Sequence, residues 1–266
     1  MLYNAKNGVI HVDDHDMHYI RFGTGKKTMI MIPGVGDGFK TVKGTALPFA
    51  YAYRRFARDF TVYVFSRREN LPAGFTTQNM AEDTAKAMDI LSIKSASIVG
   101  VSQGGMIAMH LAADYPEKIE KLVLAVTAAC ANETIGTVVT SWIDMAHRDE
   151  FKNIMIDSRE KSYTEKYLKT YRMAYPFIPL MKPSSLDRFI IQAQSCLSHD
   201  ATGKLGLIRC PVLVLGRAED KIVTGDASRH IARSIPGSVL HIWPGYSHGV
   251  YEEAKDFNSR VLDFLE

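Results

Sequence analysis

Residues 97–106, with the sequence SIVGVSQGGM, decide the fold of this chain. Their β-branched residues predict a strand that ends at Ser102, and the apolar run 106–113 predicts a helix directly after it. Glycine stands two residues before and two residues after Ser102. A serine in a sharp strand-to-helix turn has a strained backbone, and glycines at those two positions avoid steric clashes. A Gly-x-Ser-x-Gly pattern between strand and helix predicts a nucleophile elbow, with Ser102 as the nucleophile.

Strand-like apolar runs alternate with helical patterns on both sides of this turn. The chain opens with two alternating segments, 9–12 and 17–22, which predict an antiparallel hairpin around the turn Asp13–Asp16. The His and Asp side chains of this hairpin, Asp14 among them, point to opposite faces of a strand, so we expect a solvated turn and no metal site. Further strands are predicted at 28–32, 61–65, 95–101, 121–126, 211–215 and 239–243. The alternation predicts an α/β fold with a doubly wound, mostly parallel sheet.

A helical insertion interrupts this alternation. Between residues 128 and 204 no run reads as a strand, and the helical patterns there are rich in Met, Tyr, Phe and Trp. We therefore divide the chain into a core, residues 1–127 and 205–266, and an α-helical cap, residues 128–204. A helical layer over the carboxyl edge of a sheet creates a cavity there, so the composition of the cap predicts a pocket for an apolar acyl group or ring.

Two later positions are candidate partners of Ser102. A serine hydroxyl needs a base to take its proton, and a carboxylate orients the histidine that does so. In the chain order nucleophile, acid, histidine, the acid follows the first strand after the insertion and the histidine follows the last strand. Asp220 and His248 stand at these places. Glu219 is the competing carboxylate, and the shorter acid is favoured.

The loop Pro33–Gly38 follows a buried strand and carries three glycines. It does not match the dinucleotide fingerprint Gly-x-Gly-x-x-Gly, although a phosphate-binding loop and a plain tight turn remain alternatives. The presence of Ser102 favours an oxyanion hole instead. We expect its two donors to be the backbone N–H groups of Val35 and of Gln103, which begins the helix after Ser102.

The composition excludes several classes of protein. Of 266 residues, 46% are hydrophobic and 23% are charged, and the net charge of +3 does not suggest binding to nucleic acid. No apolar run approaches the ~20 residues of a transmembrane helix, and residues 1–6 contain no signal segment. The three cysteines match no metal-ligand spacing. We expect a cytoplasmic protein without a membrane partner, cofactor or metal.

The chain resembles the α/β-hydrolase-fold proteins with a cap along essentially its whole length. The motifs that carry the resemblance are Pro33–Gly36, Gly100–Gly105, Cys210–Gly216 with Asp220, and Gly245–His248. Two stretches depart from the family pattern: Pro33 replaces a common His, and residues 66–72 replace an Asp-x-Arg-Gly-x-Gly motif.

The resemblance implies a serine hydrolase that cleaves a small, apolar carboxylic ester, lactone or thioester through an acyl-enzyme. Other members of the fold suggest alternatives, namely a carbon–carbon bond hydrolase, a perhydrolase, or a ligand receptor that keeps the triad and turns over slowly. Each of these would act on a small molecule.

Overall fold

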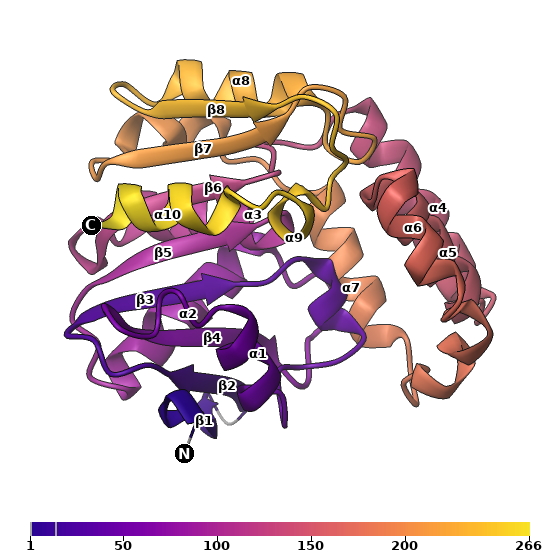
Figure 1. Cartoon of the computed structure of the whole chain (residues 1–266), viewed down its shortest axis with the longest axis horizontal. Coiled ribbons are helices and arrows are strands. Elements are labelled where there is room, and N and C mark those ends of the chain that lie inside the picture. The colour runs from indigo at the N-terminus through magenta and orange to yellow at the C-terminus, as the bar shows by residue number, and fades with distance from the viewer. Residues whose placement is uncertain (1, 14) are drawn as a thin grey trace.

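The computed structural model describes residues 2–13 and 15–266, and a single mixed sheet of eight strands forms the centre of this part of the chain (Figure 1). The strand order is β1-β2-β4-β3-β5-β6-β7-β8. The pairs β1–β2 and β2–β4 are antiparallel, and every later pair is parallel. The sheet confirms the predicted α/β architecture. The strands are β1 (Lys6–Val12), β2 (His15–Phe22), β3 (Lys27–Ile32), β4 (Phe60–Arg68), β5 (Ala96–Val101), β6 (Ile119–Ala125), β7 (Val212–Arg217) and β8 (Val239–Trp243).

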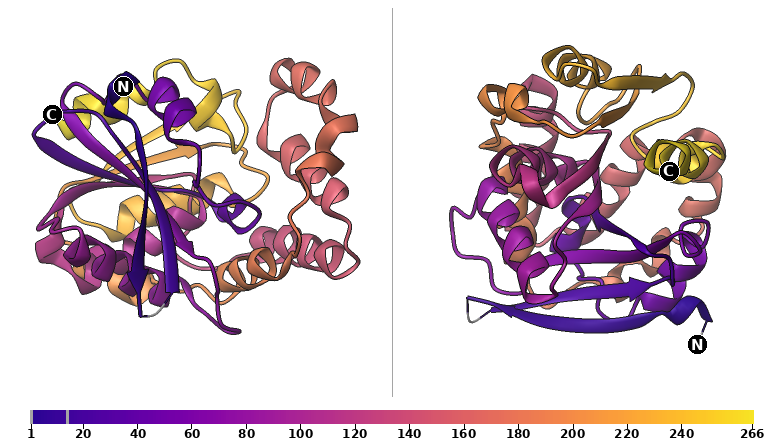
Figure 2. Two further views of the ribbon diagram at one scale, coloured as in Figure 1. Left: turned by 90° about the horizontal axis from the view of Figure 1, so that it is seen from below. Right: turned by 90° about the vertical axis from the view of Figure 1, so that its left-hand side faces the viewer.

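The central strands are buried on both faces because helices cover each side of the sheet (Figure 2). Successive residues of a strand point to opposite faces, so Ile98 belongs to one core and Val99 to the other. Helices α2 (Thr77–Ile90), α3 (Gln103–Asp114) and α8 (Gly225–Ser234) cover the first face. Helices α1 (Ala46–Ala52), α9 (Val250–Glu253) and α10 (Phe257–Leu265) cover the second. This burial explains the continuous apolar strands of the sequence.

The hairpin predicted at the start of the chain is present as β1 and β2. Asp14, part of its predicted turn, lies outside the described residues. Two stretches with the apolar spacing of a helix, residues 48–60 and 250–265, form helices shorter than the stretches themselves. In the stretch 48–60, helix α1 ends at Ala52, and residues 53–59 continue through turns with hydrogen bonds such as that from Phe56 N–H to Tyr53 O (3.0 Å). The pattern 250–265 is divided into α9 and α10 at Ala254, whose backbone is extended.

Four helices lie between β6 and β7 and stand beyond the carboxyl ends of the parallel strands (Figure 1). They are α4 (Glu133–His147), α5 (Phe151–Ser162), α6 (Glu165–Arg172) and α7 (Asp187–Leu197), with the 3-10 segment η4 (Tyr175–Met181) between α6 and α7. Asn132 caps the start of α4: its side-chain oxygen accepts from Ile135 N–H (2.9 Å), and its amide donates to Val223 O of the core (3.0 Å). This residue therefore starts the helix and attaches it to the core.

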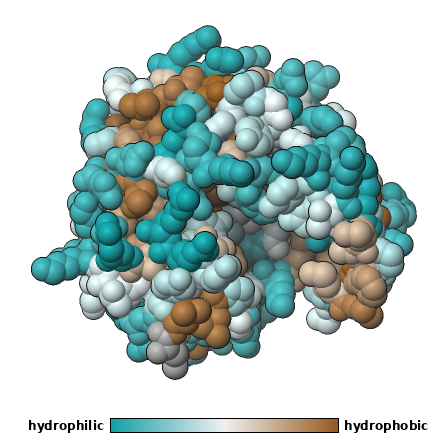
Figure 3. Space-filling model, viewed as in Figure 1, coloured by the Kyte–Doolittle hydropathy of each residue, from teal (hydrophilic) through white to brown (hydrophobic). Residues whose placement is uncertain are grey.

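The apolar residues of these helices are divided between a buried cluster and an exposed patch. Trp142, Phe151 and Phe189 belong to the cluster, which also reaches Met106 of α3. Around η4, by contrast, apolar side chains face solvent, and Figure 3 shows them at its lower right. The exposed residues are Met173, Phe177, Leu180 and Met181. Not all of the aromatic and Met residues of this region therefore form a core or a pocket. Within the described ranges, no helix is long and apolar enough to cross a membrane.

Candidate active site

Ser102 stands between β5 and α3 in a backbone conformation that is unusual for a non-glycine residue, with φ 54° and ψ −121°. The two flanking glycines are required by close backbone contacts. A Cβ on Gly100 would lie 2.5 Å from Gly104 O, and a Cβ on Gly104 would lie 1.9 Å from Ile32 O. The steric role predicted for these glycines is confirmed. The close packing of β5, α3 and β3 around Ser102 keeps its backbone in this strained conformation.

His248 and Asp220 are joined by a hydrogen bond of 2.8 Å between Nδ1 and Asp220 Oδ2. The other carboxylate oxygen of Asp220 accepts the backbone N–H groups of Ile222 (2.8 Å) and Val223 (3.0 Å). Burial raises the pKa of Asp220, but the charge and hydrogen bond of His248, with the two N–H groups, outweigh this effect and hold that pKa below its usual value. Glu219, the competing carboxylate, is exposed and pairs with Arg217 instead.

Ser102 and His248 line the same cavity, which has a volume of about 240 Å³. No direct hydrogen bond joins them among the described residues, and bonds of this kind often form only when substrate is present. Gly34 lies against the serine, since a Cβ placed on it would be 3.8 Å from Ser102 Oγ. In the structure the predicted serine and histidine therefore line the same cavity, and the predicted acid is hydrogen-bonded to the histidine.

The backbone N–H groups of Val35 and Gln103 both begin helical segments. Val35 starts the 3-10 segment η2 (Val35–Gly38), and Gln103 is the first residue of α3. Such N–H groups have no intrahelical acceptor, and neither of these two has a backbone acceptor in the part of the chain that is described. Both N–H groups thus lack a backbone acceptor, Val35 lines the cavity with Ser102, and Gln103 directly follows the serine.

The walls of the cavity are partly apolar and partly polar. The side chains of Val35, Trp142, Met155 and Ile222 form an apolar part. The polar part comes mainly from α5 and its surroundings and was not predicted from the sequence. It consists of Ser158, Arg159, Ser162, Tyr163, Tyr171 and Tyr251.

Arg67, at the end of β4, connects the two segments that carry the N–H donors. Its Nη2 donates to Pro33 O (2.5 Å), just before η2, and to Gln103 Oε1 (2.9 Å). Burial lowers the pKa of Arg67 to about 10, which leaves it charged at neutral pH. The Gln103 amide in turn donates to Gln192 O (2.7 Å) and Ser195 Oγ (3.0 Å) of α7. Sequence reasoning missed this role, although an arginine at the end of an apolar strand could have signalled a buried charge.

Asp37, inside η2, is held by a second arginine. Arg188 of α7 donates from Nη2 to Asp37 Oδ2 (2.5 Å), and the same oxygen accepts Arg67 N–H (3.1 Å). Only 1% of the Asp37 side chain is exposed, so both contacts are shielded from water. The loop with Val35 is therefore fixed from the sheet and from α7 at once.

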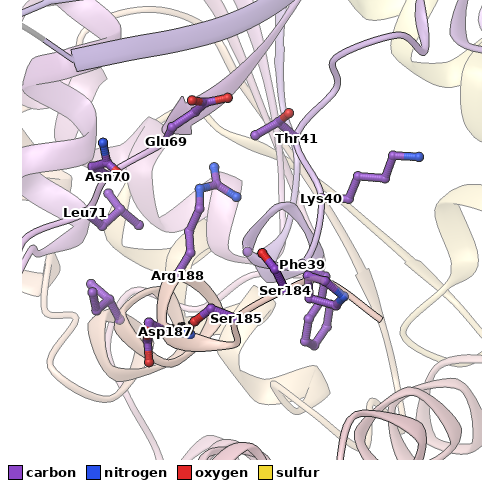
Figure 4. A pocket seen from close by; sticks show the side chains of 13 residues that line it. Phe39, Lys40, Thr41, Glu69, Asn70, Leu71, Ser184, Ser185, Asp187 and Arg188 are labelled. Carbon is purple, nitrogen blue, oxygen red and sulfur yellow. Dashed lines mark hydrogen bonds between the residues drawn. The ribbon is translucent and has the colours of Figure 1, made fainter. Parts of the chain in front are cut away.

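A larger hollow of about 450 Å³ lies beside α7 (Figure 4). Phe39, Lys40, Glu69 and Asp187 are among its lining residues, and Arg188 reaches it from α7. It contains neither Ser102 nor His248. Size alone therefore does not identify the reactive site, and the smaller cavity is the candidate.

Residues 27–255 match the alpha/beta hydrolase fold family, and the chain belongs to this family. The match covers strands β3 to β8, the serine turn and both loops that carry Asp220 and His248, but not the hairpin of β1 and β2.

Known proteins resemble the chain over nearly its whole length. It is 28% identical to the serine hydrolase BPHL of Mus musculus over 98% of this chain and 85% of that protein. It is 24% identical to a 2-hydroxy-6-oxononadienedioate/2-hydroxy-6-oxononatrienedioate hydrolase of Pseudomonas sp, over 97% and 92% of the two chains. The enol-lactonase from Burkholderia xenovorans LB400 has a similar structure, with a TM-score of 0.83 and 20% identity over 97% of this chain and 99% of that one. These relatives are hydrolases.

Proposed function

We propose that the chain is a serine hydrolase that cleaves a small carboxylic ester, lactone or thioester with an apolar acyl group or ring. The observation that supports this most strongly is that Ser102 and His248 line one cavity while His248 is hydrogen-bonded to Asp220. The helical layer of residues 128–204 acts as a cap, because Trp142 and Met155 from it form the apolar wall over Ser102.

In the proposed reaction, Ser102 Oγ attacks the carbonyl carbon and His248 takes its proton. The carbonyl oxygen becomes an oxyanion, which the N–H groups of Val35 and Gln103 stabilise. The tetrahedral intermediate collapses, the leaving group accepts the proton from His248, and an acyl-enzyme on Ser102 remains. Water then attacks the acyl-enzyme while His248 takes its proton, and the bond to Ser102 Oγ breaks as His248 returns this proton to the serine and the acid is released. Asp220 orients the imidazole and stabilises its charged form throughout.

Ser102→Ala tests the nucleophile directly. We expect a fluorophosphonate probe to label the wild type and not this variant, and kcat with p-nitrophenyl butyrate to fall by about 10⁴-fold or more. His248→Ala should be nearly as damaging, and Asp220→Asn somewhat less. Glu219→Gln is the matched control and should retain activity. Unchanged labelling of Ser102→Ala would contradict the proposal, and a loss confined to Glu219→Gln would move the acid by one residue.

Carbon–carbon bond hydrolysis is the second candidate, and the similarity to a 2-hydroxy-6-oxononadienedioate hydrolase favours it. The same serine, histidine and acid would be used. Incubation with that dienedioate and with p-nitrophenyl esters separates the two activities. A kcat/KM for the dienedioate that exceeds all ester values, and that is lost in Ser102→Ala, would make carbon–carbon cleavage the main reaction.

A further inference from the structure

The cavity that holds Ser102 and His248 also holds an arginine that forms no ion pair with any described residue. Arg159 of α5 lines it, and its Nη1 is buried without a hydrogen-bond partner. In the described part of the chain its guanidinium forms no ion pair and no hydrogen bond. A buried donor on a charged group is costly when it is left unpaired, so this arrangement favours a ligand that supplies the missing acceptor.

Arg159 is exceptional among the arginines of residues 128–204. Arg148 pairs with Glu150 at 2.9 Å, Arg172 with Glu160 at 2.6 Å, and Arg188 with Asp37 at 2.5 Å. The three arginines that do not line the cavity are thus each paired with an acidic side chain. No described acid lies within ion-pair distance of the arginine that lines the cavity.

Neighbouring groups hold Arg159 in place without neutralising it. Its Cζ lies 5.3 Å from the centre of the Tyr171 ring, a cation–π contact. Glu252 lies close enough for the charge of Arg159 to oppose the burial that raises the pKa of this carboxyl. Its carboxylate nevertheless accepts hydrogen bonds from the hydroxyls of Tyr163 (2.8 Å) and Tyr171 (3.3 Å), not from Arg159. Ser158, also in the cavity wall, lies next to Arg159 and adds a hydroxyl.

We propose that Arg159 binds a carboxylate of the substrate, so that the substrate is acidic and carries its reactive carbonyl at one end and a carboxylate at the other. The planar guanidinium matches a carboxylate with two parallel hydrogen bonds. The apolar wall contacts the carbon chain between the two groups. This inference rests on the proposed function and replaces the expectation of a wholly apolar substrate with one that is apolar only in its middle.

The test compares esters that differ only in the terminal group. Mono-p-nitrophenyl esters of adipic, pimelic and suberic acid carry a terminal carboxylate, and p-nitrophenyl hexanoate, heptanoate and octanoate are their neutral counterparts. In the wild type we expect a higher kcat/KM for the acidic ester at one chain length at least. In Arg159→Met the acidic-to-neutral ratio should fall about 10- to 100-fold at that length, and Arg159→Lys should restore part of it.

Lys152→Met is the matched control, because Lys152 is an exposed cation of the same helix outside this cavity. It removes the same charge and should leave both kcat/KM values unchanged. A ratio that Arg159→Met leaves unaltered, or a neutral preference of the wild type at every length, would overturn the inference. Equal falls in Lys152→Met and Arg159→Met would also overturn it, since a general field effect would then explain the preference.

Failure of the proposed function is distinguishable from failure of this inference. If the wild type hydrolyses none of the esters, or if Ser102→Ala hydrolyses them equally well, the proposed function fails. Titration calorimetry with adipate, pimelate and suberate then decides the inference alone. Binding that is lost in Arg159→Met supports it, and binding that is absent or equal in both proteins overturns it. Arg159→Gln enters the same comparisons if thermal unfolding shows that Arg159→Met is not folded.

Discussion

His199 is a buried imidazole that the proposed reaction does not use. Only 2% of the residue is exposed, its Nδ1 lies 2.8 Å from Thr77 Oγ1, and its Nε2 has no partner among the described residues. The ring of His110 meets it edge-on at 5.1 Å between centres. Burial, together with the charge that His110 can carry, lowers the pKa of His199 to about 3. Its imidazole is therefore neutral in the folded protein at every pH above that value.

This lowered pKa predicts a loss of stability in acid. An unfolded histidine binds a proton below about pH 6.5, so between pH 6.5 and 3 the unfolded state binds more protons than the folded state. The free energy of unfolding then falls with decreasing pH, by up to roughly 2 kcal/mol from pH 7 to pH 5 for this one group. We expect the free energy of unfolding of His199→Gln to fall less between pH 7 and pH 5 than that of the wild type, as measured by urea unfolding at both pH values.

His147→Gln is the control for that measurement, because His147 is exposed near the end of α4. It should show the same pH dependence as the wild type. If His199→Gln and the wild type lose equal stability between pH 7 and pH 5, His199 is not held neutral in the folded protein.

Among the elements, α7 is attached to the core by a buried ion pair. Arg188→Met would remove the donor to Asp37 and leave the carboxylate of η2 partly unpaired in a shielded place. We expect the free energy of unfolding to fall by about 3–5 kcal/mol, as is typical when one partner of a buried pair is removed. The loss of kcat should exceed the change in KM, because the segment with the Val35 donor would no longer be fixed. Chemical denaturation and steady-state kinetics measure the two effects.

The corresponding control is Arg172→Met, on α6. Arg172 likewise forms ion pairs, with Glu160 and Glu165, but these contacts are open to water. Solvent screens such pairs, so this variant should be much less destabilised than Arg188→Met. Equal losses in the two variants would contradict the view that burial gives the Arg188 contact its strength.

The type and order of most elements could be predicted because their burial is visible in the sequence pattern. The strands with buried faces on both sides read as continuous apolar runs, and the serine turn carries its own glycines. Helix ends were harder to predict, since α1 ends at Ala52 although the apolar spacing continues to Phe60. Apolar spacing alone does not show where a helix changes into a series of turns.

In the candidate site, too, some features could be predicted from the sequence and others could not. Asp220 and His248 meet because each follows the carboxyl end of one of two neighbouring parallel strands, which the chain order already implied. The roles of Arg67 and Arg188 depend on partners 36 and 151 residues away, and no local spacing encodes them. The role proposed for Arg159 was still harder to predict from the sequence, because it depends on the absence of a partner for Nη1 within the described structure.

At the scale of the whole molecule, core and helical layer build the cavity jointly. Ser102, His248 and Ile222 come from the core, while Trp142 and Met155 come from the layer above it. If the proposed function holds, the length of the acyl group that fits therefore depends on side chains from both parts of the chain. Each additional buried methylene should improve kcat/KM by about fourfold until the cavity is full, from about 0.8 kcal/mol per group.

Met155→Ala should move this limit, because it removes a flexible side chain from the cavity wall and leaves the reacting groups in place. With neutral p-nitrophenyl esters of increasing acyl length, we expect the wild type to reach a maximum of kcat/KM and then decline. In Met155→Ala the maximum should lie one to three carbons later. Met145→Ala is the matched control, since Met145 packs on the same apolar cluster without lining the cavity. A maximum at the same length in all three proteins, or an equal displacement in Met145→Ala, would show that this wall does not set the length of the acyl group.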